Sequence, residues 1–170
     1  ASSWETSQDY KKWTVRLRKG VTFHSGEIAT SADVKFGIER QLEPGSLSAR
    51  AAYFKDTLAS IETPDNETVV FQLKKGDVFF LYQALSALEA LDGMVVPKTY
   101  IQEKGDGYFG QHPIGTGPYK FDKQVPGDFL RLAAVGNHWR DGKPKFATVE
   151  FRAVPEETTR VALLQNGQVD

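Results

Sequence analysis

WTVRLRKGVTFHSGEIATSADVKFGIER, residues 13 to 40, joins two patterns that predict different secondary structures. Over residues 13–17, apolar side chains alternate with Thr14 and Arg16, and this period of two is typical of a half-buried strand. The glycines at positions 20 and 26 indicate turns after it. A strand, turns and a helix within 28 residues predict a mixed α/β fold.

The second half of this stretch predicts a helix that begins near Thr30 or Ser31. Either hydroxyl can cap the helix, and Asp33 lies three residues after Thr30, where its carboxylate can accept a hydrogen bond from the cap amide. The expected buried stripe has the spacing i, i+4 and i+8 and consists of Val34, Ile38 and Leu42. Pro44 and Gly45 are expected to end this helix.

The rest of the chain continues to alternate between strand and helix patterns, with mostly antiparallel strand pairs. Strands are expected at 69–73, 119–124, 128–135 and 147–154. Helices are expected from Asp77 onward, at 98–104 and at 155–167, with Gly167 as the C-terminal cap of the last one. In the helix that follows Asp77, the predicted buried side consists of Leu81, Leu85 and Leu88.

Composition excludes several classes of function. Of the 170 residues, 40% are hydrophobic and 25% are charged, as in a globular protein, and the net charge of −1 provides no broad cationic surface for nucleic acid. The absence of cysteine excludes disulfides and thiolate metal sites. Charged residues interrupt the longest apolar run, 78–96, so we expect a helix and its exit there rather than a bilayer span.

The two ends of the sequence suggest that it is a piece of a longer protein. Residues 1–13 lack the basic and apolar regions of a signal peptide. The last residues, QVD, stop where a further strand would begin. We therefore expect a mature or excised segment.

The stretch HPIGTGPYKF, residues 112–121, can be interpreted as a phosphate loop or as a turn. A P-loop has a lysine and a Ser or Thr after its last glycine, at the start of a helix. Here Gly117 is followed by Pro118 and by a predicted strand, and the proline removes a backbone donor. The pattern favours a tight turn.

No motif indicates catalysis, a cofactor or a metal. His24, His112 and His138 lack the close spacing of a metal site, and each lies beside turn residues, where an exposed or locally hydrogen-bonded imidazole is expected. No GxSxG sequence is present. Glu89 and Asp92 are three residues apart on one side of the predicted helix, either as its solvated face or as ligand-binding groups.

Taken in order, several segments resemble the bacterial extracellular solute-binding protein family 5, the peptide- and nickel-type receptors of ABC importers. Residues 13–40 resemble its signature run, with mild departures at Ser25, Ile28 and Gly37. Further matching segments are TPDNETVVFQL, VVPKTYI, PIGTGPYKF, NHWRDGKPKFATVEFRAV and TTRVALLQNGQVD. The resemblance covers essentially the whole chain.

The resemblance implies a fold of the class II periplasmic-binding-protein type. Family members are roughly three times as long and have two lobes that close on the solute like a hinged trap. By this resemblance, residues 4–108 are the smaller accessory domain, residues 109–170 are part of lobe I, and the second lobe is absent. The GTGPY stretch then marks the point where the chain re-enters the main lobe.

The resemblance also implies a function without bond chemistry. The expected activity is capture of a small solute, most simply an oligopeptide, for ABC permease subunits in the periplasm or at the cell surface. The membrane is then contacted only through the transporter or through a lipid anchor outside this segment. No arginine lies in LEALDGMVVP, where nickel-chelate relatives have one, so nickel is disfavoured. The candidate solute-binding residues are Leu88, Glu89 and Asp92.

One alternative from a different class remains open. A hydrolase or transferase domain could use a noncontiguous site around His24 or His112. Turnover that is lost on replacing either histidine would favour that hypothesis.

Overall fold

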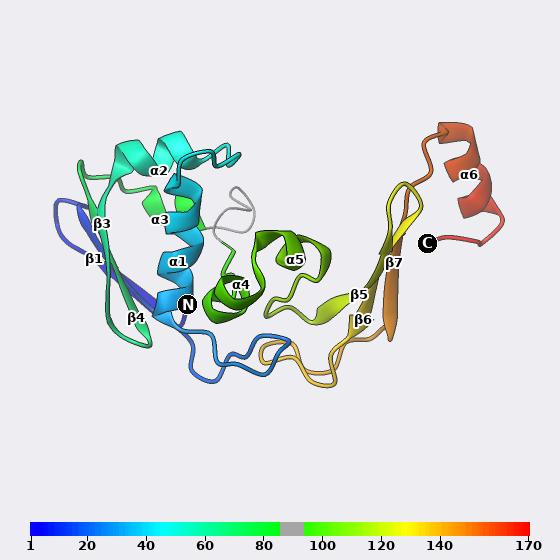
Figure 1. The fold of residues 1–170 in the computed structure, drawn as a ribbon, viewed down its shortest axis with the longest axis horizontal. Coiled ribbons are helices and arrows are strands. Elements are labelled where there is room, and N and C mark those ends of the chain that lie inside the picture. The colour runs from blue at the N-terminus through cyan, green and yellow to red at the C-terminus, as the bar shows by residue number, and fades with distance from the viewer. Residues whose placement is uncertain (86–93) are drawn as a thin grey trace. The chain divides into compact units, whose positions relative to one another are not determined.

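The computed structural model describes residues 1–85 and 94–170, which form two compact units (Figure 1). Unit 1 is Ala1–Thr116 and unit 2 is Gly117–Asp170. Each unit contains one antiparallel sheet and at least one helix, which confirms the mixed α/β class. Within the described ranges, no helix combines the length and the apolar content that crossing a membrane requires.

The sheet of unit 1 has four antiparallel strands in the order β1-β2-β4-β3. The strands are β1 Ser3–Thr6, β2 Lys12–Arg16, β3 Leu58–Asp65 and β4 Thr68–Leu73. The register places Trp13 opposite Phe71 and Val15 opposite Val69, so the apolar residues of β2 and β4 share one face. The strands expected at 13–17 and 69–73 are confirmed, whereas β1 and β3 were not expected.

The helices of unit 1 are α1 Ser31–Leu42, α2 Ala51–Thr57, α3 Phe80–Leu85, α4 Lys98–Lys104 and α5 Asp106–Gln111. The predicted start of α1 is confirmed, since the Thr30 backbone N–H donates to Asp33 Oδ2 at 2.8 Å. Its predicted stripe is only partly correct: Ile38 is buried, but Leu42 is exposed.

The predicted buried side of α3 is wrong by one position. Phe80 and Ala84 are fully buried, whereas Leu81 and Leu85 are only partly buried at the margin of the core. The side chain of Phe80 packs against Phe71, with ring centroids 5.2 Å apart. This aromatic contact rotates the helix, because a phenyl ring buries more apolar area than a leucine side chain. Leu88 lies outside the described residues.

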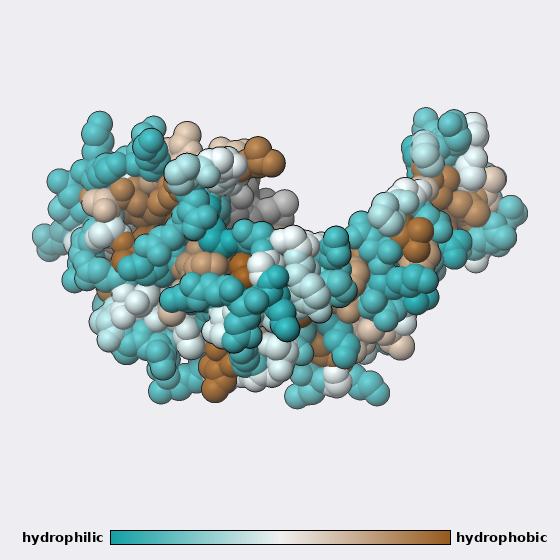
Figure 2. All heavy atoms as spheres, viewed as in Figure 1, coloured by the Kyte–Doolittle hydropathy of each residue, from teal (hydrophilic) through white to brown (hydrophobic). Residues whose placement is uncertain are grey.

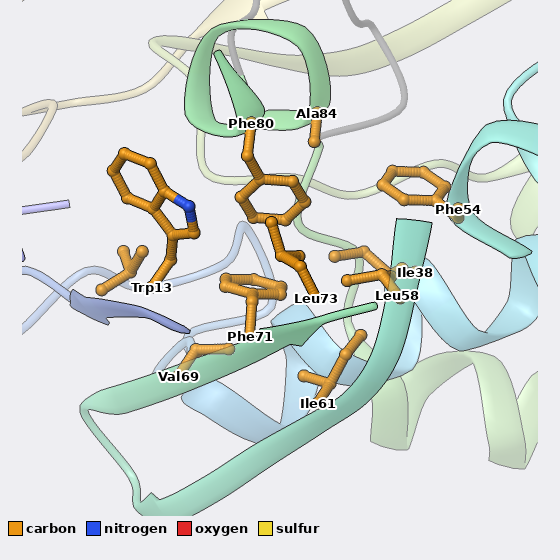
Figure 3. Packing of buried hydrophobic residues seen from close by; sticks show 11 residues of the cluster. Trp13, Ile38, Phe54, Leu58, Ile61, Val69, Phe71, Leu73, Phe80 and Ala84 are labelled. Atoms are coloured by element: carbon orange, nitrogen blue, oxygen red, sulfur yellow. The ribbon is translucent and has the colours of Figure 1, made fainter. Parts of the chain in front are cut away.

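Among the described residues, a hydrophobic core lies between the sheet of unit 1 and the helices that cover one of its faces (Figure 3). Three phenylalanines from three different elements, Phe54, Phe71 and Phe80, are completely shielded from solvent. The remaining members of the cluster are Trp13, Val15, Ile38, Leu58, Ile61, Val69, Leu73 and Ala84.

Unit 2 contains the three strands and the helix expected for it. They are β5 Tyr119–Val125, β6 Phe129–Ala134, β7 Thr148–Arg152 and α6 Glu157–Gln165, and the sheet order is β5-β6-β7. The C-cap of α6 is Asn166, one residue before the expected Gly167, which follows it with φ +64°, a conformation that favours glycine. The next amide, Gln168 N–H, donates back to the Leu163 carbonyl at 2.9 Å.

Unit 2 has an amphipathic sheet but no hydrophobic core. The register aligns Leu130 with Phe151 and Leu132 with Val149, so these four side chains share one face. Only His138 is buried in unit 2, and Phe151 is 59% exposed. Apolar atoms are visible at the surface over α6 (Figure 2). The apolar residues of unit 2 therefore still contact water.

Candidate functional site

The three candidate solute-binding residues, Leu88, Glu89 and Asp92, lie outside the described part of the chain. The elements on either side of them are described: α3 ends at Leu85, and the chain continues from Met94.

The first flank is fixed to the sheet of unit 1. Asp77 Oδ1 accepts a hydrogen bond from the Phe79 N–H at 2.8 Å, just before α3 begins. Asp77 Oδ2 accepts a longer one, 3.4 Å, from the Tyr53 hydroxyl. Burial of that hydroxyl, together with the nearby Asp77 charge, raises the pKa of Tyr53, so it remains a protonated donor at neutral pH. The buried side chain of Phe80 then holds α3 against the core.

The second flank is fixed to α1. Asp33 Oδ1 accepts a hydrogen bond from the Lys98 N–H, the first residue of α4, at 2.9 Å. At Gly37 the two segments come so close that an added Cβ would lie 3.4 Å from both the Met94 carbonyl oxygen and Val96 Cγ2. Pro97 is fully buried, while Met94 is exposed. The sequence predicted the helix-capping role of Asp33 but not this second contact.

An apolar groove of about 440 Å³ lies between β1 and the start of α3. Its rim includes Trp4, Phe79 and Tyr82, each more than half exposed. The other lining residues are Ala1, Trp13, Val15, Val78, Leu81 and Leu85. The sequence analysis missed this groove because it did not predict β1, a four-residue strand that brings Trp4 opposite Val15.

A second hollow, beside the turn between β3 and β4, is lined by residues of both charges. Arg16 lies 3.9 Å from Glu5, and Lys19 Nζ lies 3.2 Å from the Glu67 carboxylate. The hollow is therefore lined by a mixture of cationic residues, Arg16, Arg18 and Lys19, and anionic residues, Asp65 and Glu67.

His24 and His112, the residues of the enzyme alternative, have structural contacts. His24 Nδ1 accepts the Gly115 N–H at 3.2 Å, and the Gly115 carbonyl accepts the His24 backbone N–H at 2.8 Å. The His112 ring stacks on Tyr108 with centroids 4.3 Å apart. The Gly115 N–H that a phosphate loop would use is thus already bonded, which supports the interpretation of GTGP as a turn.

His138 belongs to a local turn of unit 2. Its Nδ1 accepts the Asp141 N–H at 3.3 Å, and the chain closes an isolated bridge between His138 and Gly142. Hydrogen bonds from Arg140 lower the pKa of Asp141. Across the described residues, no three His, Cys, Asp or Glu side chains are grouped in a way that could hold a metal ion.

Comparison with known protein families matches residues 1–170 to the model for the middle region of the bacterial extracellular solute-binding proteins, family 5. The chain belongs to this family. The family consists of binding proteins rather than enzymes, which confirms the binding interpretation against the hydrolase or transferase alternative. The extracytoplasmic location is likewise that of the family.

Among curated relatives, the glutathione-binding protein GsiB of Escherichia coli O157:H7 is 31% identical to this chain over 168 residues. That alignment covers 99% of this chain and 32% of GsiB, so the chain spans about a third of the length of this relative.

Two solved structures confirm the fold. The periplasmic binding protein AgaA from A. tumefaciens R10, in complex with agropinic acid, matches with a TM-score of 0.88 and 32% identity, covering 100% of this chain and 33% of AgaA. DppA from Helicobacter pylori, in complex with the peptide STSA, matches with a TM-score of 0.82 and 28% identity, covering 99% and 36%. The fold is thus that of one third of a class II periplasmic binding protein.

Proposed function

We propose that this chain is part of the substrate-binding component of an ABC importer and that the solute is an oligopeptide. The observation that carries the proposal is the family match over all 170 residues. The oligopeptide assignment is supported by the glutathione-binding relative, since glutathione is a tripeptide, and by the peptide-bound DppA. The agropinic acid complex of AgaA shows that solutes vary among such proteins, so the solute requires its own test.

In this proposal the chain contributes the accessory domain, residues 4–108, and part of lobe I, residues 109–170, to a two-lobed protein. The second lobe lies outside the chain. The uncovered apolar face of unit 2 supports this assignment, because an amphipathic sheet is stable only when its apolar face is buried. The division between the two compact units, at Thr116 and Gly117, lies close to the proposed boundary.

Leu88, Glu89 and Asp92 are proposed to contact the solute. The two carboxylates provide charges for the ammonium group at the N-terminus of a peptide, and the leucine provides apolar surface for a side chain. Anchored flanks on both sides support this role, because a binding segment with fixed ends loses less conformational entropy when the solute is captured.

The proposed partners are ABC permease subunits, which receive the solute after the lobes close on it. The longer protein then works outside the cytoplasm, and it meets the membrane through the transporter or through a lipid anchor outside this chain.

Mass spectrometry of solute that copurifies with the longer protein tests this function. We expect a short peptide, bound with calorimetric affinity at least about tenfold higher in the longer protein than in residues 1–170, because one lobe buries only part of the solute. Equal affinity in both would contradict the two-lobe account. Glu89→Gln and Asp92→Asn should weaken binding, whereas the control Glu103→Gln, on exposed α4 surface, should not.

A further inference from the structure

Asp33 is the only buried carboxylate in the described part of the chain, with 8% of its surface exposed. Three donors contact it. The Thr30 N–H and the Thr30 hydroxyl both donate to Oδ2, each at 2.8 Å, and the Lys98 N–H donates to Oδ1 at 2.9 Å. Capping of α1 explains the hydrogen bonds to Oδ2. It does not explain the hydrogen bond to Oδ1, whose donor is a backbone amide 65 residues further along the chain.

A second close contact lies one turn further along α1. At Gly37 an added Cβ would lie 3.4 Å from the Met94 carbonyl oxygen and from Val96 Cγ2, within ordinary van der Waals contact, so the two segments pack directly against each other there. Asp33 thus bonds the Lys98 end of residues 94–98, and Gly37 lies against their other end. Beyond this segment, Ile101 of α4 is buried.

We infer that Asp33 is a positioning residue for solute binding. Its carboxylate fixes the path of residues 94–98, which directly follow the candidate solute-binding residues, and it does so without touching the solute. This inference rests on the proposed function. It extends that function, because it gives α1, through Asp33, the role of holding residues 94–98 in place.

The chemistry of a carboxylate suits this role. Asp33 lies at the N-terminal ends of two helices, α1 and α4, where unpaired backbone N–H groups and the helix dipole favour a negative charge. Asparagine has the same shape but only one acceptor oxygen, and its NH2 group would face an N–H donor. Residue 33 is connected both to Thr30 and to the Lys98 amide. Asp33→Asn therefore removes one of these two connections while leaving the side-chain volume unchanged.

A second variant removes the same hydrogen bond from the other side. Lys98→Pro deletes the donor N–H, and proline is well tolerated at the first residue of a helix. The preceding residue, Pro97, has φ −75° and ψ 104°, an extended conformation compatible with a following proline. Thr30→Ala is the matched control, because it removes a hydroxyl from Asp33 Oδ2 but keeps the bond to Lys98.

Hydrogen–deuterium exchange on the 170-residue chain tests the positioning directly. We expect Asp33→Asn and Lys98→Pro to speed exchange of the Ile101 and Gly105 amides, which donate to the Pro97 and Ile101 carbonyls at 3.1 and 2.8 Å, by about tenfold, the effect of losing one hydrogen bond to a charged group. Thr30→Ala should leave these amides unchanged. Unchanged exchange in Lys98→Pro would overturn the inference, whatever the solute is.

Calorimetry on the longer protein, with glutathione and trialanine as probes, tests the link to binding. We expect about tenfold weaker binding in Asp33→Asn and in Lys98→Pro, no further loss in the double variant, and unchanged binding in Thr30→Ala. Unchanged affinity despite faster exchange would overturn the positioning role. If the unsubstituted protein binds neither probe, the oligopeptide proposal fails, while the exchange measurement still decides whether Asp33 holds residues 94–98 in place.

Discussion

Unit 1 and unit 2 use the same sequence pattern with different results. Both contain antiparallel strands whose apolar residues share one face. In unit 1 that face is covered by helices, and Phe54, Phe71 and Phe80 are fully buried. In unit 2, Phe146, Phe151 and Leu164 remain more than half exposed. An alternating pattern therefore predicts which face of a strand is apolar, but it does not show whether the same segment provides the cover.

The difference indicates how each unit is stabilised. Burial of apolar surface is the main stabilising term in folding, so unit 1 contains its own source of stability. Unit 2 has backbone hydrogen bonds between three strands and a helix closed by backbone hydrogen bonds at its C-terminus, but little buried apolar area. Under the proposed function, its apolar face is covered by the remainder of lobe I.

Matched phenylalanine substitutions should show the largest contrast between the units. Phe71→Ala removes a fully buried ring and should cost about 3–5 kcal/mol of unfolding free energy, or unfold unit 1 outright. Phe151→Ala removes a mostly exposed ring and should cost less than about 1 kcal/mol. Urea denaturation followed by tryptophan fluorescence measures both. Similar losses for the two variants would contradict the contrast.

Matched glycine substitutions should show a smaller contrast. A Cβ on Gly76 would lie 2.1 Å from the Asp9 carbonyl oxygen, so Gly76→Ala must displace backbone in unit 1, at a cost of about 1–3 kcal/mol. Gly136 in unit 2 has open space at the same position, and Gly136→Ala should be nearly neutral. Thermal melting of both variants, followed by circular dichroism, distinguishes them. A neutral Gly76→Ala would show that unit 1 is packed less closely than described.

The smallest expected effect concerns the pH dependence of unit 1. A hydrogen bond from the Glu67 N–H, followed in importance by one from the Thr68 hydroxyl, lowers the pKa of Asp65 below its usual value of 3.8. A lowered pKa in the folded state stabilises the fold above the unfolded-state pKa, and this stabilisation is lost as the pH falls through the folded-state value. Asp65→Asn should therefore lose less stability than the unsubstituted chain between about pH 5 and pH 2, as measured by urea denaturation. Identical pH profiles would contradict the role of Asp65.

Local signals made part of the fold predictable. The start of α1 was found because Thr30 and Asp33 are three residues apart and bond to each other. The strands β5 and β7 were found because apolar and polar residues alternate in them, and β6 because it is a short apolar run interrupted only by Arg131. In contrast, β1 is four polar and aromatic residues with no buried member, and β3 has only two buried positions, Leu58 and Ile61. Such strands are defined by pairing with another strand, β1 with β2 and β3 with β4, rather than by a pattern of their own.

The candidate site was less predictable for the same reason. The sequence identified Asp33 as a capping residue, but its contact with the Lys98 amide depends on how α1 and α4 pack. Gly37 was noted only as a departure from the family pattern, and its position against Met94 and Val96 likewise depends on the packing of distant segments. Solute contact by Leu88, Glu89 and Asp92 remains a proposal.

Separate expression of residues 1–116 and 117–170 tests the contrast between the units most directly. We predict that residues 1–116 give a cooperative thermal transition and an ordered near-ultraviolet circular dichroism spectrum from Trp4 and Trp13. Residues 117–170, which contain Trp139, should show neither. A cooperative transition in isolated residues 117–170, at a concentration where they are monomeric, would contradict the account.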